Sequence, residues 1–135
     1  MRRGGIDEAG YGPILGPLAI VGVWVAVEDS EACDRDLRDL GVDDSKALHR
    51  PGDLAPLERV ALAGATWLGG RQPATAAEFL ALVGEADTAR TLPWMQGAEA
   101  LTLPLAATDL PRWSISSARP LGVGGHLIHP GHLNR

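Results

Sequence analysis

The sequence predicts one α/β domain, and three observations carry that prediction. Strand-like apolar segments dominate the start of the chain, helical patterns follow, and a further apolar segment comes late. The 135 residues fit a single domain, and 45% of them are hydrophobic, which is enough for a packed core. Strands followed by helices and another strand are typical of an α/β architecture.

The opening part of the chain is expected to supply two strands. The first begins at Ile6 and ends near the adjacent acids Asp7 and Glu8. Residues 18–27 are apolar on both faces and rich in β-branched side chains, which favours a central strand. Residues 28–40 are charged and carry leucines at helical spacing, so they are interpreted as a short helix or a solvated loop.

Helices are expected in the middle of the chain, with a strand between them. A polar Asp-Asp-Ser-Lys cluster precedes a helical stretch that Asp44 or Ser45 can cap. Residues 61–69 are interpreted as a strand because they are mostly apolar and are bounded by two glycines. Residues 74–83 predict a helix that Thr75 can cap.

The last part of the chain carries weaker patterns. Residues 101–107 are interpreted as one more strand, completing a domain over residues 1–110. Residues 111–135 are rich in Gly, Pro, Ser and His without a sustained period. We therefore expect them to form an irregular or disordered tail.

Composition and charge narrow the classes of function. A net charge of −5 argues against a purely electrostatic nucleic-acid binder, although an acidic enzyme can act where metal ions neutralise its site. The single cysteine, Cys33, excludes an internal disulfide and suits a reducing cytoplasm. Asp7 and Glu8 interrupt any signal peptide, and the apolar run that follows is short for a membrane span. We expect a cytoplasmic protein without a membrane anchor.

Two adjacent carboxylates at the end of a strand are the first candidate for chemistry. Neighbouring side chains of a strand point to opposite faces, so Asp7 and Glu8 share a metal only if the strand ends or bends there. Gly10 and Gly12 make such a bend accessible. Carboxylate oxygens suit Mg²⁺ or Mn²⁺. The alternative is a pair of exposed charges in a turn.

Two further segments can contact a nucleotide. Alternating glycines around Tyr11 let the backbone of Gly10, Tyr11 and Gly12 approach a sugar or phosphate closely. The hydroxyl of Ser45 and the ammonium of Lys46 are good phosphate donors. The alternative interpretation is a tight turn and a helix cap beside a solvated lysine.

These segments occur together in one family. Residues 5–13 (Gly-Ile-Asp-Glu-Ala-Gly-Tyr-Gly-Pro), Leu-Gly-Pro at 15–17, an apolar strand and Asp-Ser-Lys at 44–46 resemble the amino-terminal part of ribonuclease HII. The resemblance is specific through about Leu62 and extends to about Val83. It implies a ribonuclease H-like mixed sheet flanked by helices, incomplete on the carboxy-terminal side. Separately from the resemblance, we expect a monomer.

The resemblance also implies an activity. The family's members are endonucleases that cut the RNA strand of RNA–DNA hybrids, including at embedded ribonucleotides. Asp7 and Glu8 would be two of four acidic ligands of a Mg²⁺ or Mn²⁺ pair that drives hydrolysis. The backbone of residues 10–12 would lie against the ribose 2′-hydroxyl, and Ser45 and Lys46 would hold the phosphate backbone.

Three departures from the family leave alternatives open. Tyr11 stands where the family has arginine, and the Asp-Gly that supplies the family's third acid is absent. Asp109 follows a late apolar run and is the candidate for that third ligand. The family domain is also longer than this chain. The alternatives are an impaired or inactive relative that binds hybrid, or a small partner-binding domain whose Asp-Glu pair is only a turn.

The histidines offer a rival metal site. His126, His129 and His132 recur at intervals of three, a spacing that would align them on a helix for a transition metal. Pro130 and Gly131 argue against a helix there.

Overall fold

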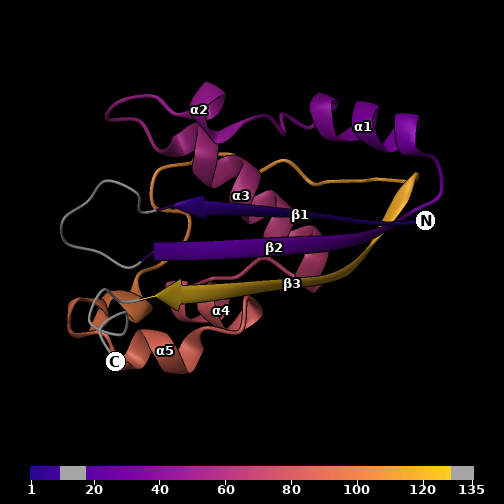
Figure 1. Ribbon diagram of the computed structural model, residues 1–135. Coiled ribbons are helices and arrows are strands. Elements are labelled where there is room, and N and C mark those ends of the chain that lie inside the picture. Colours follow the sequence, from indigo (N-terminus) through magenta and orange to yellow (C-terminus); the bar gives the residue numbers. More distant parts are fainter. Residues whose placement is uncertain (10–17, 129–135) are drawn as a thin grey trace.

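The computed structural model describes residues 1–9 and 18–128, which form a three-stranded sheet with helices packed against one face (Figure 1). The elements in chain order are β1 (Arg2–Ala9), β2 (Leu18–Val27), α1 (Ser30–Asp39), α2 (Ser45–Leu48), α3 (Ala55–Gly69), α4 (Ala76–Leu82), α5 (Ala86–Thr91), the 3₁₀ turns η1 (Pro93–Met95) and η2 (Ala98–Ala100), and β3 (Ala118–Ile128). The predicted α/β class is confirmed. The described sheet is antiparallel throughout.

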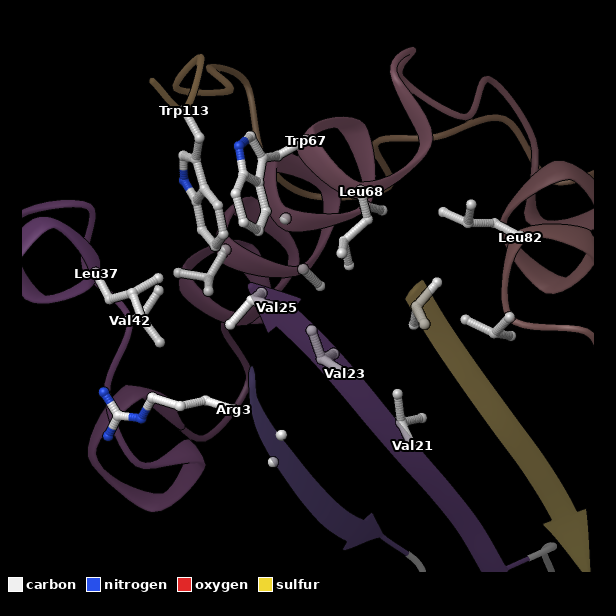
Figure 2. A pocket seen from close by; sticks show the side chains of 18 of the residues that line it. Arg3, Val21, Val23, Val25, Leu37, Val42, Trp67, Leu68, Leu82 and Trp113 are labelled. Atoms are coloured by element: carbon white, nitrogen blue, oxygen red, sulfur yellow. The ribbon is translucent and has the colours of Figure 1, made fainter. Parts of the chain in front are cut away.

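β2 is the central strand, as its apolar sequence predicts. The strand order is β1-β2-β3, and Val21 lies opposite Asp7 of β1 and opposite Gly125 of β3. Odd-numbered residues of β2, among them Val23 and Val25, face the helices, and even-numbered residues lie on the opposite face (Figure 2). The face that carries the even-numbered residues is called the open face below.

Two helices begin at capping residues that were predicted from the sequence. The Thr75 hydroxyl accepts a hydrogen bond from the Glu78 amide at 3.2 Å, so the predicted cap of α4 is confirmed. Asp44 caps α2 by accepting the Lys46 amide at 2.8 Å. Residues 28–40, which the sequence left between helix and loop, contain α1.

Three segments differ from the sequence prediction. Residues 61–69 are the second half of α3 and not a strand, because alternate alanines favour a helix and one face packs on the sheet. Residues 101–107 form no strand, and only Thr102 pairs, in an isolated bridge with Thr75. Residues 118–128, expected to be irregular, form β3 and pair along the whole of β2.

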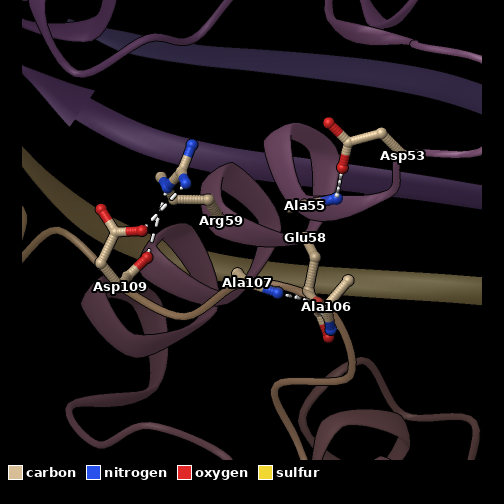
Figure 3. Close-up of polar contacts among 7 residues, drawn as sticks. All are labelled: Asp53, Ala55, Glu58, Arg59, Ala106, Ala107 and Asp109. Atoms are coloured by element: carbon tan, nitrogen blue, oxygen red, sulfur yellow. Dashed lines mark hydrogen bonds and ion pairs between the residues drawn. The ribbon is translucent and has the colours of Figure 1, made fainter.

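Glu58 anchors the segment 105–107 to α3 (Figure 3). Its carboxylate accepts the backbone amides of Leu105, Ala106 (2.6 Å) and Ala107 (2.8 Å). Burial alone would raise the pKa of Glu58, but the three amide donors outweigh burial and hold the pKa below its ordinary value. These three bonds replace the strand pairing that the apolar sequence suggested.

Trp24 occupies the space that three glycines leave free on the open face. A Cβ built on Gly22 would lie 2.7 Å from Cη2 of Trp24, and one on Gly4 would lie 3.2 Å from its Cδ1. A Cβ on Gly124 would come to 3.6 Å from Cζ3 of the same ring. The indole thus covers all three strands while staying 46% exposed.

The first prediction concerns the Glu58 carboxylate. Glu58→Gln should lower the free energy of unfolding by about 1–2 kcal/mol at neutral pH, because a neutral amide is a weaker acceptor and Glu58 is partly exposed. Since the folded-state pKa is lowered, this stabilisation is complete above roughly pH 5 and vanishes as the pH falls through that pKa. Urea unfolding at a series of pH values measures it, with exposed Glu28→Gln as control. A difference independent of pH would contradict the assignment.

The second prediction concerns the indole over the glycines. Gly22→Ala should cost about 1–3 kcal/mol in the free energy of unfolding, since the new methyl collides with Trp24. The same substitution in a Trp24→Ala background should be close to neutral. Gly122→Ala is the matched control, because nothing lies within 4 Å of a Cβ at that position. Urea unfolding of the four variants gives the coupling energy, and a coupling of zero would refute the packing account.

Candidate functional site

Asp7 and Glu8 lie at the carboxyl end of β1 and are both exposed. Asp7 pairs with Val21 and therefore leaves the sheet on the helix face, while Glu8 pairs with Ile20 and leaves it on the open face. The Oδ1 atom of Asp7 accepts the backbone amide of Glu8 at 2.9 Å. β1 runs straight through both positions to Ala9, so the bend that a shared metal site requires is not present between them.

The donor chemistry of this pair fits a hard divalent cation, but the arrangement is incomplete. Carboxylate oxygens are the ligands that Mg²⁺ and Mn²⁺ prefer, and both side chains are open to solvent. Among residues 1–9 and 18–128, however, no three acidic, histidine or cysteine side chains gather where they could hold an ion. The described residues therefore supply separate ligands and no assembled metal centre.

Asp109 lies apart from such a group and is engaged elsewhere (Figure 3). Its Oδ1 forms an ion pair with Nη2 of Arg59 at 2.9 Å, and its backbone oxygen accepts Nε of the same arginine at 3.3 Å. Asp109 thus fastens the segment before β3 to α3. Its role as a metal ligand remains a prediction.

Ser45 and Lys46 occupy the first turn of α2 and are exposed. Figure 1 shows α2 at the same end of the molecule as the tip of β1, where Asp7 and Glu8 lie. The predicted phosphate donors are therefore open to a ligand from solvent. Gly10, Tyr11 and Gly12, predicted to contact the ribose, lie outside the described residues.

Of the three histidines of the rival metal site, only His126 lies within the described residues. His126 lies on β3, and its Nδ1 is 3.4 Å from Oε1 of Glu85, a carboxylate that is only 5% exposed. The second oxygen of Glu85 accepts the Leu127 amide at 3.3 Å. Glu85 thus holds the end of β3 beside α5. His129 and His132 lie outside the described residues.

An apolar hollow of about 590 Å³ lies between the helix face of the sheet and the helices (Figure 2). Valines 21, 23 and 25 form its floor, and Trp67, Leu68, Leu82 and Trp113 are among the side chains over it. Its charged members, Arg3 and Asp34, form an ion pair with each other at 2.7 Å. This lining offers no free carboxylate and no free cation, so the hollow has no chemistry for a metal or a phosphate.

This hollow was not predicted from the sequence. The alternating valines of β2 indicate an apolar face of the sheet that other elements must cover. Because residues 61–69 were predicted to be a strand, the helix α3 that partly covers this face was not predicted.

Comparison with known proteins bears on the segment that carries Asp7, Glu8, Ser45 and Lys46. The family model of ribonuclease HII matches residues 4–57. Ribonuclease HII of Pyrococcus horikoshii is 54% identical over 48 residues, which cover 36% of this chain and 20% of that protein. Ribonuclease HII of Methanococcoides burtonii is 48% identical over 63 residues, or 47% of this chain and 25% of that protein.

The similarity extends to an animal relative. A ribonuclease H2 subunit of Caenorhabditis elegans is 51% identical over 45 residues, which cover 33% of this chain and 14% of that protein. No solved structure matches the chain. The resemblance of the amino-terminal part to ribonuclease HII is thereby confirmed, over a segment that spans a quarter or less of these relatives. Within the described residues, no helix is long and apolar enough to cross a bilayer.

Proposed function

We propose that the chain acts in the cytoplasm as a metal-dependent endonuclease on the RNA strand of RNA–DNA hybrids, including embedded ribonucleotides. The similarity of residues 4–57 to ribonuclease HII carries this proposal. That segment contains the exposed side chains to which we assign metal and phosphate contacts, namely Asp7, Glu8, Ser45 and Lys46. The net charge of −5 is unfavourable for approach to a polyanion, and a bound divalent cation would offset it at the site.

Asp7 and Glu8 would hold Mg²⁺ or Mn²⁺ at the end of β1. When bound, such an ion polarises the water that attacks the phosphodiester. β1 continues only one residue beyond Glu8, so a bend at Glu8 and Ala9 would bring the two carboxylates to one side without breaking the pairs that precede Asp7. Asp109, whose Oδ1 pairs with Arg59, would be the third ligand.

The remaining residues of the segment would bind and orient the substrate. The Lys46 ammonium would neutralise a backbone phosphate and the Ser45 hydroxyl would donate to it, both from the exposed first turn of α2. The backbone of residues 10–12 would read the ribose 2′-hydroxyl, the group that separates RNA from DNA.

A second candidate function is binding of the hybrid without cleavage. The observation that favours it is the departure of Asp7 and Glu8 from opposite faces of β1, with no third acid beside either among the described residues. Ser45 and Lys46 would serve such a binding module unchanged, because their phosphate contacts require no metal.

The third prediction separates these candidates. Asp7→Asn should slow cleavage of a labelled RNA–DNA hybrid in Mg²⁺ or Mn²⁺ by at least roughly 100-fold, since it removes a direct metal ligand. Exposed Asp39→Asn, on α1, is the matched control and should cleave like the parent chain. The melting temperature of both variants is also measured during a Mn²⁺ titration. An ion that binds only the folded state raises the melting temperature, so Asp39→Asn should show this rise and Asp7→Asn should show less of it. Equal cleavage by the parent chain and Asp7→Asn removes the catalytic assignment, and hybrid binding without any cleavage selects the second candidate.

The fourth prediction concerns Lys46, the only lysine of the chain. Lys46→Ala should weaken hybrid binding and reduce the slope of log affinity against log salt by about 1, because one phosphate contact is lost. Fluorescence anisotropy with a labelled hybrid in the presence of a chelator measures this without cleavage. Exposed Arg112→Ala removes the same charge and should leave the slope unchanged. Identical slopes for both variants would show that α2 does not touch the nucleic acid.

A further inference from the structure

Trp24 rests on the open face of the sheet with one side of its ring against glycine. A Cβ built on Gly22 would lie 2.7 Å from Cη2 of the indole and 3.2 Å from both Cζ2 and Cζ3. These three distances are similar, as expected for an atom beneath the flat of the ring rather than at its edge. The other side of the ring faces away from the sheet, in agreement with an exposed fraction of 46%. An exposed aromatic surface of this kind can stack on a planar ligand.

Two arginines lie one row away from this ring on the same face. Arg2 of β1 and Arg119 of β3 both pair with Ala26, which shares the open face with Trp24 two positions away. Because neighbouring strands are about 4.8 Å apart, the Cα atoms of the two arginines are about 10 Å apart. Both side chains are exposed. Neither guanidinium forms an ion pair or a hydrogen bond with another residue that the structure describes.

The two guanidiniums decide which kind of partner this part of the open face accepts. A protein segment packed over Trp24 would take both arginines out of water, and burying an unpaired charge is costly. Glu28, two positions beyond Ala26, is the nearest acid along β2, and it forms no ion pair with either arginine. Phosphate oxygens would satisfy both guanidiniums through charge-assisted, bidentate hydrogen bonds. The favoured partner therefore combines a planar group with phosphates beside it.

We propose that Trp24, Arg2 and Arg119 form a binding site for a single strand of nucleic acid. One base stacks on the exposed side of the indole, and the two arginines contact phosphates of the same strand. The bases of a duplex are stacked on one another, so the site selects single-stranded over double-stranded nucleic acid. It has little preference for sequence, since every base offers a flat aromatic face.

The surroundings of Trp24 leave room for such a ligand. Gly4 and Gly122 are its partners on the two neighbouring strands, so no side chain stands beside the ring at either position. Glycine permits a close approach of the backbone to a ligand. Ile6 pairs with Gly22, beneath the ring, and is 72% exposed, so it offers apolar contact to the stacked base.

This site is separate from the candidate metal site. Asp7 leaves β1 on the opposite face, and Glu8 pairs with Ile20, four positions and therefore about 14 Å along β2 from Trp24. The single strand requires no metal ion and leaves both carboxylates free. The proposal does not rest on nuclease activity, and binding measured in the presence of a chelator tests it independently of cleavage.

The salt dependence of binding tests the two arginines. Fluorescence anisotropy with a labelled oligouridylate of about twelve nucleotides, at low salt with a chelator, should show binding by the parent chain. Arg2→Ala and Arg119→Ala should each weaken binding and lower the slope of log affinity against log salt by about 0.7, as expected for one phosphate contact of a single strand. Exposed Arg112→Ala removes the same charge outside the sheet and should keep the parent slope. A parent chain that binds no single strand, or equal slopes for the three variants, overturns the proposal.

Photochemical cross-linking tests the stacking. An oligomer that carries 5-bromouridine should, on irradiation, attach to Trp24 of the parent chain, as peptide mapping by mass spectrometry would show. Trp24→Leu should weaken binding roughly fivefold or more and keep the salt slope, because it removes stacking and no charge. Cross-links that form only elsewhere contradict the site, whether or not the variant folds well. A dimer of the parent chain that Trp24→Leu dissociates in sedimentation velocity would identify a second copy as the partner of this face and would also overturn the proposal.

Discussion

The antiparallel ladder through β2 is the constraint on which the rest of the structure depends. Because β2 pairs with β3 over its whole length and with β1 from Ala19 to Ala26, it fixes the face on which the side chains of both neighbours emerge. The same register that places Trp24 above its glycines also sends Asp7 and Glu8 to opposite faces. The packing of the sheet and the geometry of its acidic pair therefore follow from the same strand register.

Local sequence chemistry predicted the parts of the fold that depend on local signals. The boundaries of β2 and the Thr75 cap of α4 could be read directly, since β-branched runs and capping hydroxyls act within a few residues. Residues 61–69 misled because a short apolar run fits a buried strand and a buried helix equally, and only the alanines distinguished them. β3 could not be found locally, because its glycines and proline disfavour a strand. They are tolerated because β2 supplies the pairing and Trp24 the cover.

In the candidate site, too, local sequence predicted the individual residues but not how distant residues come together. Asp7, Glu8, Ser45 and Lys46 were predicted from two short motifs, at residues 5–13 and 44–46, and their exposure agrees with roles in binding. Whether carboxylates converge depends on which distant residues come to the end of β1, and no local pattern encodes that. Asp109 illustrates the difficulty: its position after an apolar run suggested a metal ligand, yet its nearest described partner is Arg59, fifty positions away.

The separation of β3 from its partner in the sequence has a consequence for how the chain is made. Leu18 pairs with Ile128, so β3 is synthesised long after the two strands, β1 and β2, that it joins. Closing so long a loop is slow. Until β3 has been made and has paired, one edge of β2 in the nascent chain has no neighbouring strand. An edge of this kind can pair with other chains, so aggregation during synthesis competes with the addition of β3.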